Sequence, residues 1–85
     1  MTTHEACIGT RVRTNVALSG IPRWSEGVID EDYGTGVMVA WDLPGRPLPS
    51  GYRSHQGVGA EAGILRDGFD KVSELHFLQV VTART

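Results

Sequence analysis

Cysteine, lysine and long apolar runs are scarce in this sequence. Cys7 is the single cysteine in 85 residues, so the chain cannot form an internal disulfide. A chain without disulfides suits a reducing compartment. The sequence shows neither a basic-then-apolar leader nor the run of ~20 apolar residues that a membrane helix needs. We therefore expect a cytoplasmic protein that does not enter a membrane.

Excess charge is also missing. The formal net charge is −2, which argues against a chain that is drawn as a whole to nucleic acid or to acidic membranes. The basic residues are seven arginines and Lys71. Arginine favours planar, stacked or bidentate contacts, so this bias points weakly to interfaces.

Recognisable catalytic and metal-binding motifs are absent as well. His4, His55, His76 and Cys7 show no pair at metal-ligand spacing, so we expect no metal and no cofactor. No recognisable nucleophile motif includes Cys7, which favours burial as a small apolar residue over a role as nucleophile. The acidic run 30–32 lacks the spacing of a calcium loop, so we expect solvated carboxylates at a hairpin end. We do not expect an enzyme.

What the sequence does contain is a series of short β-strand patterns, enough for one small domain. Residues 8–14 alternate apolar and polar side chains, and residues 26–32, 36–42 and 76–81 are further strand candidates, with a fourth strand inside 64–72. Ser73 could cap one 3₁₀ turn over 73–75. The expected domain spans residues 7–82, after a flexible tail at residues 1–6.

The segment 36–42 is the clearest of these strands. Val37, Val39 and Trp41 fall on one face, and Met38 and Ala40 fall on the other. Because both faces are apolar, we expect a central strand that is covered on each side. We also expect Trp41 and Phe69 to be core residues.

A long loop is expected over residues 43–63. It contains Pro44, Pro47 and Pro49 with several glycines, which disfavour regular structure. Such a loop in so small a domain is either a ligand-binding segment, a cover for the sheet, or a segment exchanged between subunits.

Four segments carry a resemblance to a known fold: Gly9–Arg13, Glu26–Ile29, Gly36–Trp41 and Asp70–Leu78. Together they resemble SH3-like small barrels of the KOW and Tudor style. The resemblance implies a mainly β fold, a small barrel of about five antiparallel strands with one 3₁₀ turn. In size and composition the chain also resembles small uncharacterised proteins of bacterial integron gene cassettes.

In SH3-like barrels, aromatic side chains in loops often line a groove for proline-rich segments or methylated cations. The resemblance therefore implies a ligand-binding role for Trp24, Tyr33 and Tyr52. The function expected is that of a non-enzymatic protein-binding or peptide-binding module, which could be a homo-oligomer because so small a domain is marginally stable.

Two alternatives stay open. Arg11, Arg13 and Arg23 could share one face and contact phosphates, as in a nucleic-acid-binding barrel. The chain could instead be an oligomeric enzyme with its site between subunits. The plasmid-borne type II dihydrofolate reductases are such barrels, but the segment 78–81 lacks the tyrosine of their Val-Gln-Ile-Tyr signature, so their functional residues do not transfer to this chain.

Overall fold

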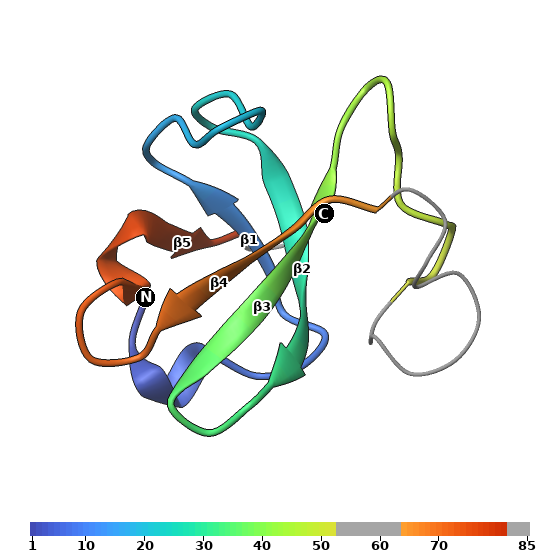
Figure 1. Cartoon of the computed structure of the whole chain (residues 1–85). Helices are drawn as coiled ribbons and strands as arrows, with labels where there is room; N and C mark the ends of the chain where they lie inside the picture. The colour runs from blue at the N-terminus through green and yellow to red at the C-terminus, as the bar shows by residue number, and fades with distance from the viewer. Residues whose placement is uncertain (53–63, 82–85) are drawn as a thin grey trace.

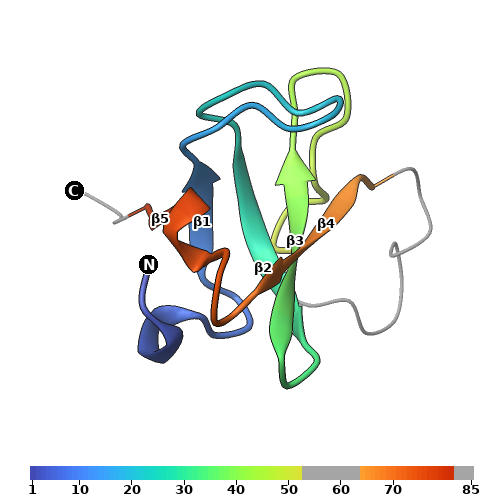
Figure 2. The ribbon, with the colours of Figure 1, turned by 60° about the vertical axis from the view of Figure 1, so that its left-hand side comes forward.

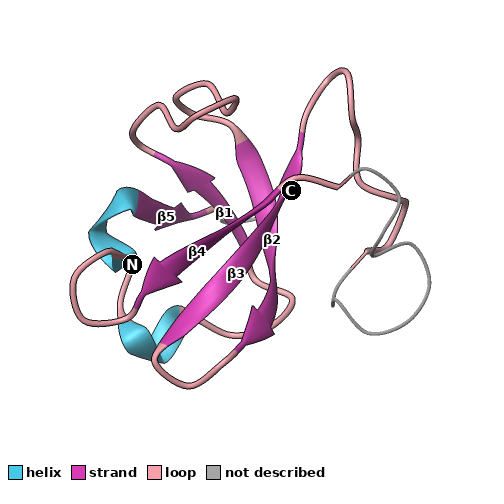
Figure 3. Cartoon of the chain, in the orientation of Figure 1, coloured by secondary structure: helices cyan, strands magenta, loops and turns pink. Residues whose placement is uncertain are grey.

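The protein folds as one five-stranded antiparallel sheet with two single-turn 3₁₀ helices, which confirms the mainly β expectation (Figures 1 and 3). The structure is a computed structural model that describes residues 1–52 and 64–81. The elements are η1 (Thr3–Glu5), β1 (Arg11–Thr14), β2 (Glu26–Asp32), β3 (Gly36–Asp42), β4 (Arg66–Asp70), η2 (Leu75–Phe77) and β5 (Leu78–Val80). The strand order is β4-β3-β2-β1-β5, so β4 and β5 are the edge strands.

The strands β2 and β3 form a hairpin that matches the predicted ranges to the residue. Their register is regular from Glu26 to Ile29, which lies opposite Val39, and then shifts so that Glu31 lies opposite Met38. Asp30 is therefore the extra residue of a β-bulge. The bulge places Glu31 on the same face as Met38, beside Asp30, so both carboxylates can take part in the ion pairs described below.

The sheet is strongly curved, as Figure 2 shows from the side, and the buried apolar residues form one core cluster. The inward face of β3 supplies Val37, Val39 and Trp41, all fully buried, as predicted for a central strand. The Trp41 ring meets Phe69 edge-to-face at a centroid distance of 6.2 Å, and Phe69 is also buried. Both aromatic rings are core residues, as expected.

The opposite face of β2 and β3 is also covered. Val28 and Ala40 lie directly opposite each other and are buried, although they do not belong to the core cluster. Gly27 is needed nearby, because a Cβ there would lie 2.4 Å from the carbonyl oxygen of Ala40. The two strands therefore approach closely enough to bury apolar side chains on both faces.

The N-terminal region differs from the expected flexible tail. Residues Thr3–Glu5 form η1, which begins with a capping box between Thr2 and Glu5, and Ala6 is buried in the core. The N-terminal ammonium of Met1 donates to the carbonyl of Leu78 at 3.0 Å. These contacts fasten the start of the chain to the region around β5.

Burial of Cys7 was predicted and is wrong, because the thiol is exposed. Ala6 fills the core position next to it, and Cys7 lies in the surface turn that leads to β1. The first strand is also shorter than the predicted 8–14. Gly9 adopts a left-handed φ of 94°, which bends the chain before Arg11 and leaves Ile8 half-exposed.

The predicted 3₁₀ turn lies two residues later than expected, at Leu75–Phe77, and Ser73 does not cap it. The reason is a turn that precedes it. Asp70 accepts hydrogen bonds from the backbone N–H groups of Val72 and Ser73, and the Ser73 hydroxyl also points to Asp70. Ser73 is thus already engaged in ending β4.

The long loop leaves β3 after Asp42 and is described as far as Tyr52. The N–H of Leu48 donates to Asp42 at 2.9 Å, and the Tyr52 hydroxyl donates to Asp30 at 2.8 Å. These two contacts fasten this part of the loop to the outer face of β2 and β3. The remainder of the predicted loop, residues 53–63, lies outside the described residues, as does the predicted domain end at residue 82.

Candidate functional site

The loop between β1 and β2 carries an exposed tryptophan in a strained backbone conformation. Leu18 and Ile21 exchange two backbone hydrogen bonds, and the buried Ile21 anchors the loop in the core. The chain then returns so that the N–H of Trp24 donates to the carbonyl of Thr14 at 2.8 Å. Trp24 has a φ of 72°. Among the residues that the structure describes, it is the one non-glycine residue with positive φ. Its side chain is 46% exposed.

Positive φ is costly for a bulky residue. The left-handed conformation costs roughly 1–2 kcal/mol for an L-residue, and it persists where surrounding contacts impose it. Because the ring is nearly half-exposed, burial in the core does not account for the strained backbone. Strain of this kind concentrates at functional sites, which makes Trp24 the first candidate.

Two arginines lie over the Trp24 ring. The guanidinium carbon of Arg23 is 4.6 Å from the ring centroid and that of Arg13 is 5.2 Å away. Both distances fit cation–π contacts. The Nε–H of Arg13 donates to the Gln79 side chain at 3.1 Å, and the Nε–H of Arg23 donates to the carbonyl of Asn15 at 2.9 Å. We call Arg13, Trp24 and Arg23 the Arg–Trp–Arg surface.

The two arginines of this surface differ from other basic residues in the described chain. Arg11, Arg66 and Lys71 each form ion pairs with carboxylates. Across residues 1–52 and 64–81, neither Arg13 nor Arg23 has a carboxylate within ion-pair distance. The surface therefore carries two positive charges that the described fold does not neutralise.

Arg11 lies on the same side of β1 as Arg13 but serves a different network. Its Nε donates to Glu26 and its Nη2 to Asp42, each at 2.9 Å. Bonding to Asp42 and Glu26 raises the pKa of Arg11, and the same contact with Arg11, together with the N–H of Leu48, lowers the pKa of Asp42. Arg11 thus holds together β1, β2 and β3 and is already neutralised.

A second network lies around the bulge residue Asp30. Asp30 is 2% exposed, and its carboxylate receives the Arg66 guanidinium through two bonds, Nε to Oδ2 at 2.8 Å and Nη2 to Oδ1 at 3.0 Å. The same Nη2 donates to Glu31 at 2.8 Å. The expected solvation of the acidic run is therefore wrong for Asp30. Alternation along β2 places Asp30 on the same covered outer face as Val28, and Arg66 of β4, which pairs with Ala40 on that face, reaches it.

Tyr52 belongs to this buried network. Its hydroxyl donates to Asp30, and desolvation together with that hydrogen bond raises the pKa of Tyr52 to about 12. The phenol is thus a fastening point for the long loop. Its polar end is engaged within the protein.

Tyr33 lies in the turn that joins β2 to β3 and is 47% exposed. Its hydroxyl end lies over two glycines, because a Cβ on Gly36 or Gly68 would meet it at 2.4 or 3.1 Å. Tyr33 therefore covers a stretch of sheet that has no side chains of its own.

The three aromatic residues predicted to share a groove do not form one cluster. Trp24 precedes β2 and Tyr33 follows it, so a seven-residue strand of about 20 Å separates their backbones. Figure 1 shows the two connections at the top and the bottom of the molecule. Of the six predicted site residues, the structure brings together Trp24, Arg13 and Arg23.

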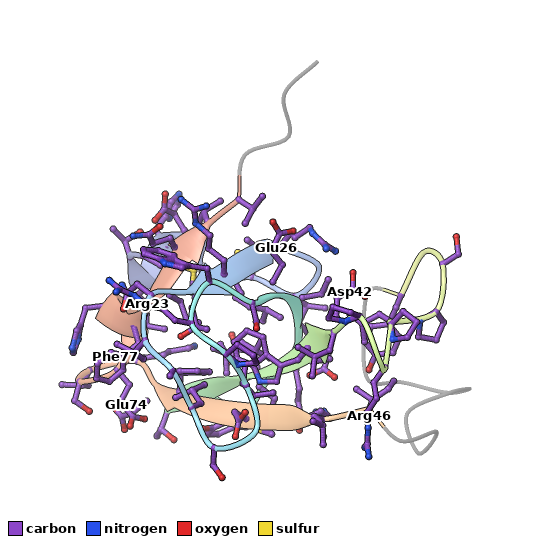
Figure 4. The ribbon with its side chains drawn as sticks, turned by 90° about the horizontal axis from the view of Figure 1, so that it is seen from above. Arg23, Glu26, Asp42, Arg46, Glu74 and Phe77 are labelled. Carbon is purple, nitrogen blue, oxygen red and sulfur yellow. The ribbon has the colours of Figure 1, made fainter. Side chains whose placement is uncertain are left out.

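The long-loop side is also separate from this surface. In Figure 4, Arg23 and Phe77 lie on one side of the molecule, and Asp42 and Arg46 lie on the other side with the loop. Sequence reasoning missed Gln79 and Asn15 as the groups that orient the two arginines. The alternation of arginines in β1 was a signal for one outward face, but it did not show which of them would be neutralised.

Other kinds of site find less support in the described chain. Within residues 1–52 and 64–81, no group of three or more histidine, cysteine, aspartate or glutamate side chains could hold a metal ion. The same residues contain no helix that is long and apolar enough to cross a membrane.

Comparison with known proteins gives no relative from which a site could be transferred. No family model matches the sequence, and neither a curated protein nor a solved structure matches it. Any functional assignment must therefore come from the geometry above.

Proposed function

We propose that this protein is a non-enzymatic binding module that recognises a protein or peptide through the Arg–Trp–Arg surface. The observation that carries the proposal is an exposed tryptophan at positive φ, flanked by two arginines without carboxylate partners in the described chain. Tryptophan and arginine are the residues most enriched among those that dominate binding energy at protein interfaces.

The preorganisation of the surface supports this function. The loop is fixed by backbone bonds to β1, and both guanidinium groups are fixed by their Nε–H bonds and by their contacts with the Trp24 ring. Groups that are already ordered lose little conformational entropy on binding. The proposal includes the SH3-like barrel as its scaffold. It is supported by β1 lying between β2 and β5 and by η2 joining β4 to β5.

The test is a selection of binders from a displayed peptide library with the wild-type protein. The selected peptides are then titrated against Trp24→Ala and against Val72→Ala, which removes an almost fully exposed side chain from the β4–η2 turn. We expect Trp24→Ala to weaken binding at least about tenfold and Val72→Ala to leave it unchanged. Peptides that bind Trp24→Ala as well as wild type would contradict the proposed surface.

A second proposal is a nucleic-acid-binding barrel. It is favoured by one observation, two arginines beside an exposed aromatic ring, which is a pattern of single-strand binding. Two features favour the protein partner instead. The guanidinium groups already contact the ring, so a stacking base would compete with them for it. The chain also has a net negative charge, which opposes long-range attraction of phosphates.

The oligomeric state decides whether a site between subunits is worth pursuing. Light scattering on a size-exclusion column across a dilution series gives the solution mass. A stable oligomer would support the homo-oligomer proposal and keep the shared-site enzyme under consideration. A monomer at all concentrations would remove both.

A further inference from the structure

We infer that the Arg–Trp–Arg surface takes an acidic, extended peptide segment in which two carboxylate side chains stand two residues apart. This inference rests on the proposed binding function and specifies its partner. It is argued from the donors left free on the two arginines, from their spacing, and from the pairing of the carboxylates elsewhere in the fold.

The two arginines have free donors in one particular direction. An arginine carries five N–H donors, and on both Arg13 and Arg23 the Nε–H is bonded within the protein. No described contact engages the Nη groups of either side chain. The Nη end of a guanidinium is a planar fork that matches the two oxygens of a carboxylate. Each arginine can therefore receive one carboxylate end-on.

The spacing of the two forks suits alternate residues of an extended chain. Both guanidinium carbons lie close to the same ring centroid, at 5.2 and 4.6 Å, so they are less than about 10 Å apart. In an extended peptide, residues i and i+2 point to the same side and are about 6.6 Å apart. Two aspartates or glutamates at i and i+2 can thus reach both arginines, with the intervening backbone near Trp24.

The carboxylates of the described fold that form ion pairs are already committed. Glu26 and Asp42 pair with Arg11, Asp30 and Glu31 pair with Arg66, and Asp32 pairs with Lys71. These groups lie in β2 and β3, so pairing them with Arg13 or Arg23 would require breaking those contacts. An external carboxylate can bind without that cost. Arg11, Arg66 and Lys71 are already paired, so they do not compete for the acidic partner.

The experiment is a nuclear magnetic resonance titration of the whole ¹⁵N-labelled chain with three blocked peptides of equal length. Their central residues are Glu-Val-Glu, Gln-Val-Gln and Lys-Val-Lys. We expect the Glu peptide to shift the indole N–H signal of Trp24 and the Nε–H signals of Arg13 and Arg23. The indole of Trp41, buried and bonded to Asp67, is the internal control and should not move.

Charge and position are separated by variants. Arg13→Gln and Arg23→Gln should each weaken the Glu peptide about tenfold, the effect of losing a charge-assisted hydrogen bond. Lys71→Gln removes the same charge at the opposite end of β2 and should change affinity less than about twofold. Retained signal dispersion shows that each variant is folded.

The outcomes distinguish this inference from the function on which it rests. If library-selected peptides shift Trp24 but the Glu and Gln peptides bind equally, the acidic partner is wrong while the binding surface stands. If binders leave Trp24, Arg13 and Arg23 unshifted, the proposed surface itself is wrong. If single-stranded oligothymidylate shifts these signals at lower concentration than the Glu peptide, with a steep salt dependence, the acidic peptide is overturned in favour of nucleic acid.

Discussion

The hydroxyl of Tyr52 and the Nε of Arg66 bond to the same oxygen of Asp30, each at 2.8 Å. Asp30 is buried at the β2 bulge, Arg66 comes from the edge strand β4, and Tyr52 comes from the long loop. One carboxylate therefore joins three parts of the chain that are far apart in sequence.

Arg66→Met is expected to destabilise the protein strongly. It leaves the Asp30 carboxylate buried without its cation, and breaking a buried pair in this way costs about 3–5 kcal/mol. Urea denaturation followed by circular dichroism gives the free energy of unfolding. Arg11→Met is the matched control, because its pairs with Glu26 and Asp42 are more exposed and are worth about 0–1 kcal/mol.

The double variant Asp30→Asn with Arg66→Met removes both charges. It should recover a large part of the stability lost in Arg66→Met alone, since no buried charge is left unpaired. Equal losses of unfolding free energy in Arg66→Met and Arg11→Met would show that the buried pair of Asp30 contributes no more stability than an exposed ion pair.

Tyr52 should make stability fall at high pH. Its pKa is raised to about 12 in the folded protein from an ordinary value of 10.0, so the folded state holds this proton more tightly than the unfolded state. The stabilisation is fully present below about pH 10 and is lost as the pH rises through about 12. Urea unfolding across this window should show the decline in wild type and a smaller decline in Tyr52→Phe, which has no proton to lose.

The raised pKa can be observed directly by following the ultraviolet absorbance of tyrosinate in the native protein. One tyrosine of wild type should ionise near pH 12, and this step should be missing in Tyr52→Phe. A wild-type titration in which all tyrosines ionise near pH 10 would refute the contact with Asp30.

The hairpin of β2 and β3 could be predicted from sequence because its pattern is local. β-branched residues and alternating faces fix 26–32 and 36–42 with no knowledge of the rest of the fold. The start of β1 could not be predicted in the same way. Residues 8–14 alternate, yet the left-handed backbone of Gly9 ends the pattern before Arg11. Alternation shows which face a residue can take and does not show where pairing begins.

The site was less predictable because its contacts are not local. Asp30 and Arg66 are separated by 36 residues, and the bulge that brings Glu31 onto the face of Asp30 has no sequence signature in an acidic run. Trp24 and the arginines were each singled out, but as two rival sites. They form one surface because the loop returns Trp24 to Thr14, next to Arg13 in β1. The backbone conformation of the loop sets this return of the chain, and the residue composition does not show it.

Asp70 is expected to contribute stability that is lost in acid. Hydrogen bonds from the N–H groups of Val72 and Ser73 lower the pKa of its carboxyl in the folded state. A lowered folded pKa means that the stabilisation is present above the unfolded value of 3.8 and is lost as the pH falls below it. Thermal unfolding at pH 7 and near pH 3 should show a smaller acid-induced fall in melting temperature for Asp70→Asn than for wild type.

Asp70→Ala completes this comparison. Asparagine keeps an oxygen that can accept the two backbone bonds, whereas alanine removes the acceptor. At pH 7 the alanine variant should therefore have a lower melting temperature than the asparagine variant. Identical melting temperatures for the two would mean that the turn after β4 does not depend on this side chain.

The strain at Trp24 predicts an unusual order of stability for two truncations. Alanine normally stabilises a protein relative to glycine by about 0.4–1 kcal/mol, because it restricts the unfolded chain. At a φ of 72° the order should reverse, and Trp24→Gly should be more stable than Trp24→Ala by about 1 kcal/mol. Both variants lose the ring and its contacts with Arg13 and Arg23, so their difference in urea unfolding isolates the backbone term. If alanine proves the more stable of the two, the loop relaxes to an unstrained conformation once the ring is removed. The expected order would show instead that the surrounding loop imposes the positive φ at this position whatever side chain stands there.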